Sequence, residues 1–241
     1  TCYGNAFLAG ESVEQFFPSN STCQFCEQVN FVTVSKSLFG ATKETQIAGT
    51  PDAWFSHLKS RGATGIRLSC GTLPDRVLAG FAGGEENWTM EVLFPDNKSE
   101  FWTARWNVHN QNAPDRKIWR VTYGMVSKAK TRPSTTPDIE SVSNELMESL
   151  KEVKAFSFKQ KTDGFTQCFV EAMDTLASNG VNKHGYHKDL VPKQFTGGEA
   201  SAILDACQKA YVFGGMGSWN DMMFQGEDQK IYERVSDRLF K

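Results

Sequence analysis

The stretch from Trp88 to Met125 constrains the fold more than any other part of the chain, because apolar residues alternate with other residues there in three successive runs. The apolar positions are Trp88, Met90, Val92 and Phe94, then Trp102, Ala104, Trp106 and Val108, and finally Trp119, Val121, Tyr123 and Met125. A period of two in runs rich in aromatic and β-branched residues is typical of strands with one buried face. Turn-favouring residues at 95–98 and a polar loop at 109–116 separate the runs. The sequence therefore predicts an antiparallel β-meander.

The two faces of this meander are expected to differ. All four tryptophans of the stretch fall on the apolar face, and alternation points large apolar groups inward. We therefore expect them in the core rather than exposed as a platform for a sugar. The alternate positions are mostly polar, for example Thr89, Glu91 and Arg105, so we expect the second face to meet water.

The residues before the meander predict further strands and one helix. Strands are indicated at 29–34, 66–70 and 77–81, which gives a sheet of five or six strands. Thr50 is suited to cap a helix, Pro51 suits its first position, and Gly62 can close its far end in a left-handed turn. Residues 1–26 show little periodicity, and we interpret them as an irregular arm tied down by disulfides.

The character of the sequence changes after the meander. A polar stretch at 127–136 without apolar periodicity is the expected linker between a disulfide-tied, β-rich region, 1–126, and a helical region, 137–241. The helical region is expected to pack on or beside the sheet. Its first helix is indicated by an apolar stripe with spacings of three and four, formed by Ile139, Val142, Leu146, Leu150 and Val153.

Three more helices are expected, at about 165–176, at 198–213, and from Ser218 to the end with a break near Gly226. Strands followed by helices are typical of an α+β protein rather than a parallel α/β sheet. The predicted fold is therefore α+β, with a mostly antiparallel N-terminal β-meander sheet and one helix, followed by about four helices.

Composition excludes several classes of partner. The formal net charge of the 241 residues is -2, and no long run of Lys and Arg is present, so nucleic acid is not expected as a partner. No apolar run approaches the length needed to span a bilayer, so no membrane span is expected either. The hydrophobic share of 39% is that of an ordinary globular protein, which argues against disorder.

The cysteines suggest an oxidising compartment. The six are Cys2, Cys23, Cys26, Cys70, Cys168 and Cys207, and sequence alone leaves fifteen ways of pairing them. We expect Cys168 to pair with Cys207, since both lie in predicted helices, and the other four to pair among themselves. Cys23 and Cys26 also have the spacing of a redox dithiol, but they lie in a loop and not at a helix start in a βαβ unit. No second cysteine pair completes a zinc site.

Glycosylation sequons agree with a secretory route. Asn20, Asn87 and Asn97 each begin an Asn-x-Ser/Thr sequon, and all three fall at loops or strand ends, where a glycan can be carried without being buried. The chain begins at Thr1, and we expect a mature chain from which a signal peptide has been removed. The sequence thus predicts a secreted, extracellular glycoprotein with disulfide bonds.

One loop carries residues suited to catalysis. His184, His187 and Asp189 lie within six residues, and imidazoles with a carboxylate can hold a divalent metal or transfer protons. Their spacing matches no established zinc signature, and we favour the interpretation of two loop histidines near a helix end as ordinary surface residues. We therefore predict no metal site and no cofactor.

A glycine-rich turn is the second candidate site. Gly214, Gly215 and Gly217 precede Ser218, and such a sequence can form a nest of backbone N–H groups that binds an anion, with the serine as helix cap. The turn lacks the lysine of a P-loop and the preceding strand of a dinucleotide fold. The alternative is a tight interhelical turn in which glycine permits positive φ and close packing of Trp219.

Two hypotheses for function follow. The first is a secreted, N-glycosylated protein that acts by surface recognition, binding or extracellular assembly, with an extracellular protein or carbohydrate as partner, because no firm catalytic constellation is present. The alternative is a secreted hydrolase, with or without a metal, that uses His184, His187 and Asp189 in a cleft between the sheet and the helices.

Overall fold

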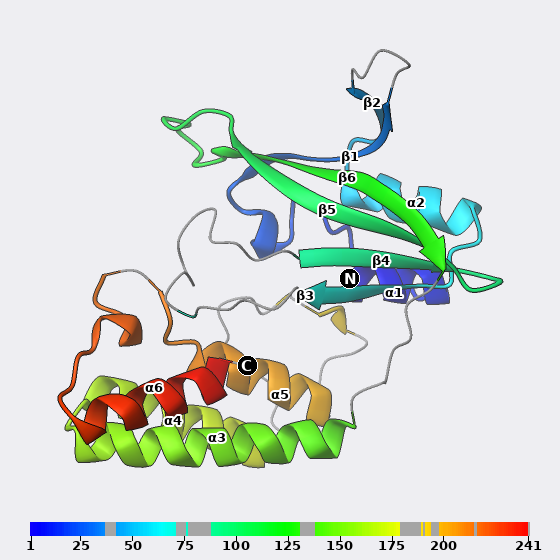
Figure 1. Cartoon of the computed structure of the whole chain (residues 1–241). Coiled ribbons are helices and arrows are strands. Elements are labelled where there is room, and N and C mark those ends of the chain that lie inside the picture. Colours follow the sequence, from blue (N-terminus) through cyan, green and yellow to red (C-terminus); the bar gives the residue numbers. More distant parts are fainter. Residues whose placement is uncertain are drawn as a thin grey trace. The chain divides into compact units, whose positions relative to one another are not determined.

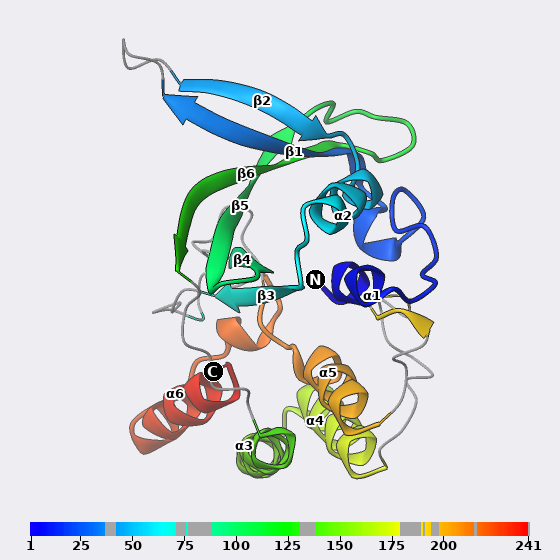
Figure 2. The same ribbon diagram turned by 90° about the vertical axis from the view of Figure 1, so that its right-hand side faces the viewer.

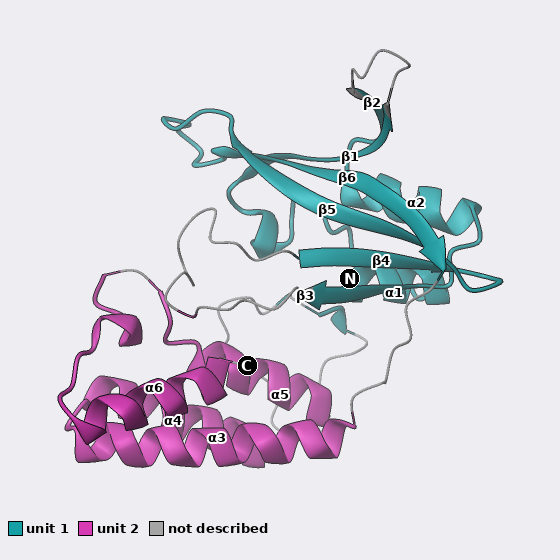
Figure 3. Ribbon diagram, in the orientation of Figure 1, with its two compact units in different colours: residues 1–72, 86–134, 189–194 teal, residues 73–85, 135–188, 195–241 magenta. Residues whose placement is uncertain are grey.

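The chain is divided into two compact units in a computed structural model that describes residues 1–36, 42–70, 76, 88–130, 138–178, 189, 191–193, 198–214 and 216–240. Unit 1 consists of Thr1–Thr72, Glu86–Ser134 and Asp189–Gln194, and unit 2 of Leu73–Glu85, Thr135–Lys188 and Phe195–Lys241 (Figure 3). Each unit therefore includes one short segment that is flanked in the sequence by residues of the other unit. These segments are Asp189–Gln194 in unit 1 and Leu73–Glu85 in unit 2.

Unit 1 is built on a six-stranded sheet with strand order β2-β1-β6-β5-β4-β3 (Figure 1). The strands are β1 Cys26–Lys36, β2 Thr42–Ala48, β3 Gly65–Cys70, β4 Trp88–Phe94, β5 Lys98–Val108 and β6 Trp119–Lys130. The predicted meander is present as β4, β5 and β6, whose pairing is antiparallel. The exception in the sheet is β1, which lies parallel to β6. The predicted α+β fold with a mostly antiparallel sheet is confirmed.

Two segments predicted from the sequence lie partly or wholly outside the described residues. The expected strand at 77–81 is one of them. The expected linker is the other, since β6 continues through Lys130 and includes residues 127–130, while 131–136 are not described.

Helix α2, Pro51–Ser60, begins as the sequence predicts. The Thr50 hydroxyl oxygen accepts a hydrogen bond of 3.2 Å from the Ala53 N–H, and Pro51 stands in the first turn, where its missing N–H costs nothing. Beyond the helix, Gly62 has a φ of +78°, the left-handed conformation expected there. In Figure 2, α2 and the N-terminal helix lie against the same side of the curved sheet.

The N-terminal segment is not wholly irregular, which corrects the sequence-based interpretation. Residues Cys2–Ala9 form helix α1, which ends at Gly10 with a φ of +91°. The Asn5 side chain anchors this helix to edge strand β3, because its amide donates to the Ile66 carbonyl at 2.8 Å and accepts from the Ile66 N–H at 2.7 Å. Periodicity could not reveal this helix, because it has only eight residues. Its link to β3 depends on the Asn5 side chain, which makes the two backbone hydrogen bonds that a neighbouring strand would make.

The core of unit 1 is aromatic. Trp54 of α2 stacks on Phe31 of β1 with ring centroids 4.3 Å apart, and it meets Trp102 of β5 edge-to-face at 5.4 Å. Both tryptophans are fully buried. Such contacts add about 0.5–1.5 kcal/mol each beyond the burial of area, so α2 is attached chiefly at the middle of the sheet.

The second face of the meander is not uniformly exposed to water, contrary to the sequence-based expectation. Glu91 and Phe101, opposite each other on β4 and β5, are both buried. Four consecutive residues of β5, Ser99 to Trp102, are buried, and the pairing register with β6 shifts between Phe101 and Trp102, as at a β-bulge. The Glu91 carboxylate is satisfied by a hydrogen bond of 2.7 Å from the Ser99 hydroxyl.

Unit 2 contains the four expected helices. They are α3 Ile139–Lys159, α4 Asp163–Ala177, α5 Glu199–Ala210 and α6 Glu227–Phe240, with a 3-10 turn, η4, at Trp219–Asp221. The last helix therefore begins later than Ser218, after the expected break at Gly226, whose φ is +58°. The core surrounds Trp219, whose indole N–H donates to the Ser236 hydroxyl at 2.8 Å.

Arg76 completes unit 2, although it lies between β3 and β4 in the sequence. Its guanidinium pairs with the Asp237 carboxylate at 3.1 Å and lies over the Tyr232 ring, 5.2 Å from the centroid. Its carbonyl accepts a hydrogen bond of 3.0 Å from the Asn220 amide. These contacts tie Arg76 to the helical unit.

Candidate functional site

The apolar face of the sheet continues past the core at one end of β5 and β6. There, Trp106 and Val108 are 55% and 57% exposed, and Trp119 is partly exposed. The Trp106 and Trp119 rings meet edge-to-face, with centroids 6.1 Å apart and an interplanar angle of 82°. Phe25 adjoins them, 39% exposed, and its carbonyl accepts the Trp119 N–H at 3.0 Å. We call these four residues the aromatic end.

Helix α2, which covers the middle of this face, is shorter than the strands. Strand β5 has 11 residues, about 36 Å, whereas the 10 residues of α2 span about 15 Å. Trp54 of α2 contacts Trp102, and Trp106 lies four residues, or about 13 Å, further along the strand.

The expectation that all four tryptophans lie in the core is therefore wrong. Trp102 is fully buried, but Trp106 and Trp88 are exposed, the latter by 45%. Alternation identified the face correctly, since Trp106 pairs with the buried Val121. The alternation could not show how much of that face is covered by other parts of the protein. A comparison of predicted strand and helix lengths is the signal that would have revealed the exposed end.

The loop that joins β5 to β6 lies directly beyond the aromatic end. The His109 N–H donates to the Ile118 carbonyl at 2.7 Å and closes the loop. The loop carries three exposed amide side chains, Asn110, Gln111 and Asn112. The Asn110 side chain accepts from the Asn112 N–H at 3.0 Å, which orders the turn.

An ion pair lies at the same end of the sheet. The Arg120 guanidinium donates to the Glu27 carboxylate at 2.8 Å, and this hydrogen bond lowers the pKa of Glu27. Arg120 alternates with Trp119 along β6, so its side chain belongs to the opposite face. The charges at this end are therefore partly neutralised within the protein.

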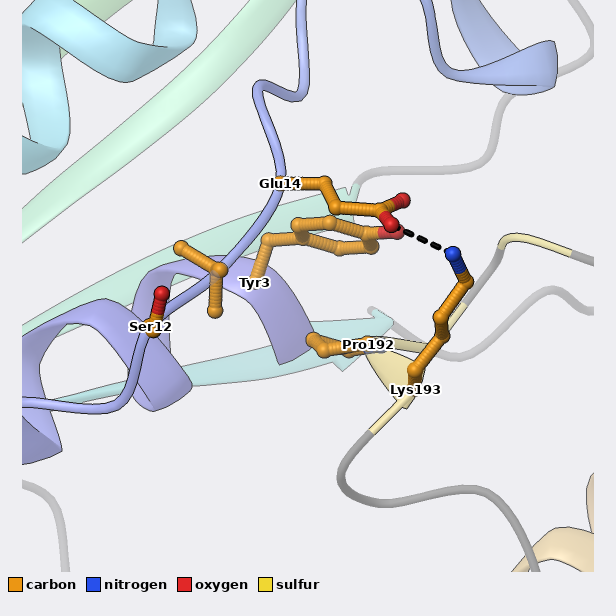
Figure 4. A pocket seen from close by; sticks show the side chains of 6 residues that line it. Tyr3, Ser12, Glu14, Pro192 and Lys193 are labelled. Carbon is orange, nitrogen blue, oxygen red and sulfur yellow. Dashed lines mark hydrogen bonds and ion pairs between the residues drawn. The ribbon is translucent and has the colours of Figure 1, made fainter.

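Unit 1 also has a pocket of about 290 Å³ between the N-terminal segment and the segment at 192–193. It is lined by Tyr3, Ser12, Val13, Glu14, Pro192 and Lys193. Figure 4 shows the Lys193 ammonium directed at the Glu14 carboxylate, with which it forms an ion pair beside the Tyr3 ring. Burial raises the pKa of the Tyr3 hydroxyl, which a hydrogen bond with Asn20 partly offsets. The phenol thus stays protonated at neutral pH and is unsuited to act as a base.

Asp189, a predicted catalytic residue, is engaged in structure-forming contacts. Its carboxylate accepts from both the N–H and the hydroxyl of Ser21, and its carbonyl accepts from the Asn20 amide at 2.6 Å. These bonds hold the segment from 189 onwards against the N-terminal part of unit 1. His184 and His187 lie outside the described residues, so the structure does not bring the three together.

The glycine-rich turn forms contacts within itself. The Ser218 hydroxyl donates to the Gly214 carbonyl at 3.0 Å, and the Gly217 N–H donates to the Asp221 carboxylate. Gly217 has a φ of +86°, as the tight-turn interpretation requires. Asp221 already accepts the N–H that the predicted anion site would offer, and Gly215 lies outside the described residues.

Cys23 and Cys26, which have the spacing of a redox dithiol, are not poised for redox chemistry. Cys23 and Cys26 are buried, and burial, together with the neighbouring Cys23, raises the pKa of Cys26 to about 11. A reactive thiol needs a lowered pKa. The cysteine side chains that the structure describes form no disulfide, and that of Cys70 is not described. Cysteine pairing therefore stays a prediction.

The predicted glycosylation sites differ in access. Asn20 is only 4% exposed, and its amide nitrogen, to which a glycan would be attached, donates to the Asp189 carbonyl. The expectation that Asn20 lies where a glycan can be carried is therefore wrong. Asn97 is exposed in the turn between β4 and β5 with a φ of +55°, and Asn87 is not described. Asn97 is the sequon best placed for modification.

The described residues contain neither a metal-binding group of side chains nor a membrane-spanning helix. No three His, Cys, Asp or Glu side chains there gather in a group able to hold a metal ion. No described helix is both long and apolar enough to cross a membrane. Compared with protein-family models, curated proteins and solved structures, the chain matches none of them.

Proposed function

We propose that this chain is a secreted binding protein whose contact surface is the aromatic end. The observation that supports the proposal is the exposure of Trp106 and Val108 on the same face of β5 as the fully buried Trp102. Single exposed apolar residues are common on protein surfaces, whereas a cluster with two tryptophans is a feature of binding sites. Tryptophan is also among the residues that contribute most to binding energy.

The aromatic end is already ordered before any partner binds. Trp119 is fixed by pairing with Cys26 on β1 and with Val108 on β5, and its ring is in contact with that of Trp106. A ligand would therefore meet a surface that loses little conformational freedom on binding, which favours affinity.

The alternative function, a hydrolase, has less support. Asp189 would have to act as an acid, a base or a metal ligand, but its carboxylate already accepts two hydrogen bonds from Ser21. The pocket next to it offers a phenol and a paired carboxylate and ammonium. Tyr3 keeps its proton there because burial raises its pKa. A His187→Ala variant with unchanged hydrolytic activity would remove this alternative.

The binding proposal is tested by replacing one of two exposed aromatic residues, one at the aromatic end and one on helix α3. Trp106→Ala should lose binding to immobilised extracellular proteins and polysaccharides that the wild type retains, measured by surface plasmon resonance. Phe158→Ala is the matched control, because Phe158 is also exposed, by 73%, but stands on helix α3 of unit 2. Equal binding by the wild type and both variants would contradict the proposal.

The extracellular assignment is tested separately by intact mass. Native protein should lose mass on deglycosylation and gain two mass units per disulfide on reduction. An Asn97→Gln variant should lose a glycan, whereas Asn20→Gln should leave the glycan mass unchanged, because the Asn20 amide is buried. Free thiols and no glycan in native material would contradict a secretory origin.

A further inference from the structure

We infer that the aromatic end binds an uncharged carbohydrate, an inference that rests on the proposed function and names its partner class. The first reason is the size of the surface. A stable protein–protein interface buries about 800 Å² and 20–30 residues on each side. The aromatic end comprises four residues, with one loop of ten beside it, from His109 to Ile118. A surface of this extent suits a few sugar rings better than a folded partner.

The second reason is the geometry of the two indoles. Their planes are nearly perpendicular, so they present surfaces in two directions rather than one flat platform. The C–H face of a pyranose ring is apolar and stacks on an aromatic ring, whose face carries partial negative charge. Trp106, the more exposed of the two, is the stacking residue, and Trp119 supports it from the side.

The third reason is the polar chemistry beside the rings. A sugar hydroxyl both donates and accepts hydrogen bonds, and an amide side chain offers both functions. Asn110, Gln111 and Asn112 are exposed in the loop that joins the two strands bearing Trp106 and Trp119. An apolar surface with amides next to it matches a ligand that has an apolar face and hydroxyls around its edge.

The fourth reason is charge. The loop carries one carboxylate, Asp115, and two cations, Arg116 and Lys117, and the nearby Glu27 and Arg120 neutralise each other. Together these five side chains carry a single net positive charge, whereas an acidic polysaccharide or an anionic membrane is attracted by a larger excess of cations. The balance favours an uncharged ligand.

The experiment uses the whole chain and defined probes. Neutral gluco-, manno-, galacto- and chito-oligosaccharides, heparin, and phosphatidylcholine vesicles are titrated against the wild type, Trp106→Ala, Gln111→Ala and the control Phe158→Ala by calorimetry. We expect one class of neutral oligosaccharide to bind. Trp106→Ala should weaken that binding at least about tenfold, equivalent to about 1.4 kcal/mol, Gln111→Ala should weaken it less, and Phe158→Ala should not change it.

Other outcomes separate the inference from the proposed function. If the wild type binds heparin, vesicles or an immobilised protein instead, and Trp106→Ala abolishes that binding, the carbohydrate inference is overturned and the binding function stands. If an oligosaccharide binds equally to the wild type and Trp106→Ala, the inference is also overturned. If Trp106→Ala changes no interaction at all, both fail. Far-UV circular dichroism of each variant establishes that the sheet is intact.

Discussion

The two units each contain an apolar face that extends beyond its core, and the two extensions differ in kind. In unit 1 the extension is the aromatic end, where two strands and the residue before β1 gather exposed rings. In unit 2 it is the first two turns of α3, where Ile139 and Val142 are exposed although the same stripe is fully buried at Leu150 and Val153. One extension is a cluster and the other a single helical edge.

This difference shows what an exposed apolar residue means. A helix that is longer than its neighbours leaves two aliphatic side chains in water, which costs little and occurs widely. The sheet instead places large rings from separate strands in contact, and this arrangement persists only because the strands pair around it. We therefore attach function to the sheet end and not to the helix end.

The largest expected effect contrasts the covered and uncovered parts of β5. Trp102→Ala should destabilise the protein by about 3–5 kcal/mol, because it leaves a cavity in the core. Trp106→Ala should cost less than about 1 kcal/mol, since the side chain is more than half exposed. Urea denaturation followed by circular dichroism measures both. Similar losses for the two variants would mean that Trp106 belongs to the core and would remove the basis of the binding proposal.

A smaller effect concerns the attachment of α2 at the covered part of β5. Arg61, just after α2, makes two hydrogen bonds of 3.0 and 2.6 Å to the buried Glu100 carboxylate, and Lys128 pairs with it at 3.2 Å. Burial would raise the pKa of Glu100, but these partners outweigh it and leave the pKa lowered. Glu100→Gln should cost about 1–3 kcal/mol near neutral pH, a figure limited by the partial exposure of Arg61.

The pH dependence of this contact has a definite sign. Because the folded-state pKa of Glu100 lies below the unfolded value, its contribution to stability is fully present above about pH 4.5 and is lost as the pH falls through the folded pKa. In the Glu100→Gln variant, the free energy of unfolding should therefore fall less steeply with decreasing pH than it does in the wild type. An equally steep fall in urea titrations of the variant would show that the pair does not hold α2 in place.

The smallest effect is expected at the start of α3. Ile139→Ser with Val142→Ser should change the free energy of unfolding by less than about 1 kcal/mol and leave ligand binding unchanged, because both side chains are exposed. Leu150→Ser, on the buried part of the same stripe, is the control and should be strongly destabilising. A loss of binding in the double variant would place a contact surface on unit 2 as well.

The sequence by itself determined the elements and the faces they present. Alternation at a period of two identified β4, β5 and β6 and the face that bears Trp102 and Trp106, because successive side chains of a strand point to opposite sides. The cap at Thr50 located the start of α2, since capping depends on neighbouring residues only. The strand-then-helix order gave the α+β class.

Only the tertiary structure decided which part of each face is covered and which distant segments meet. Whether Trp106 is core or surface depends on the length of α2 relative to β5, and whether Asn20 can carry a glycan depends on Asp189, 169 residues away. The parallel pairing of β1 with β6 is likewise non-local. Local patterns encode the orientation of a side chain, whereas burial is set by what packs against it, and that information is spread over the whole chain.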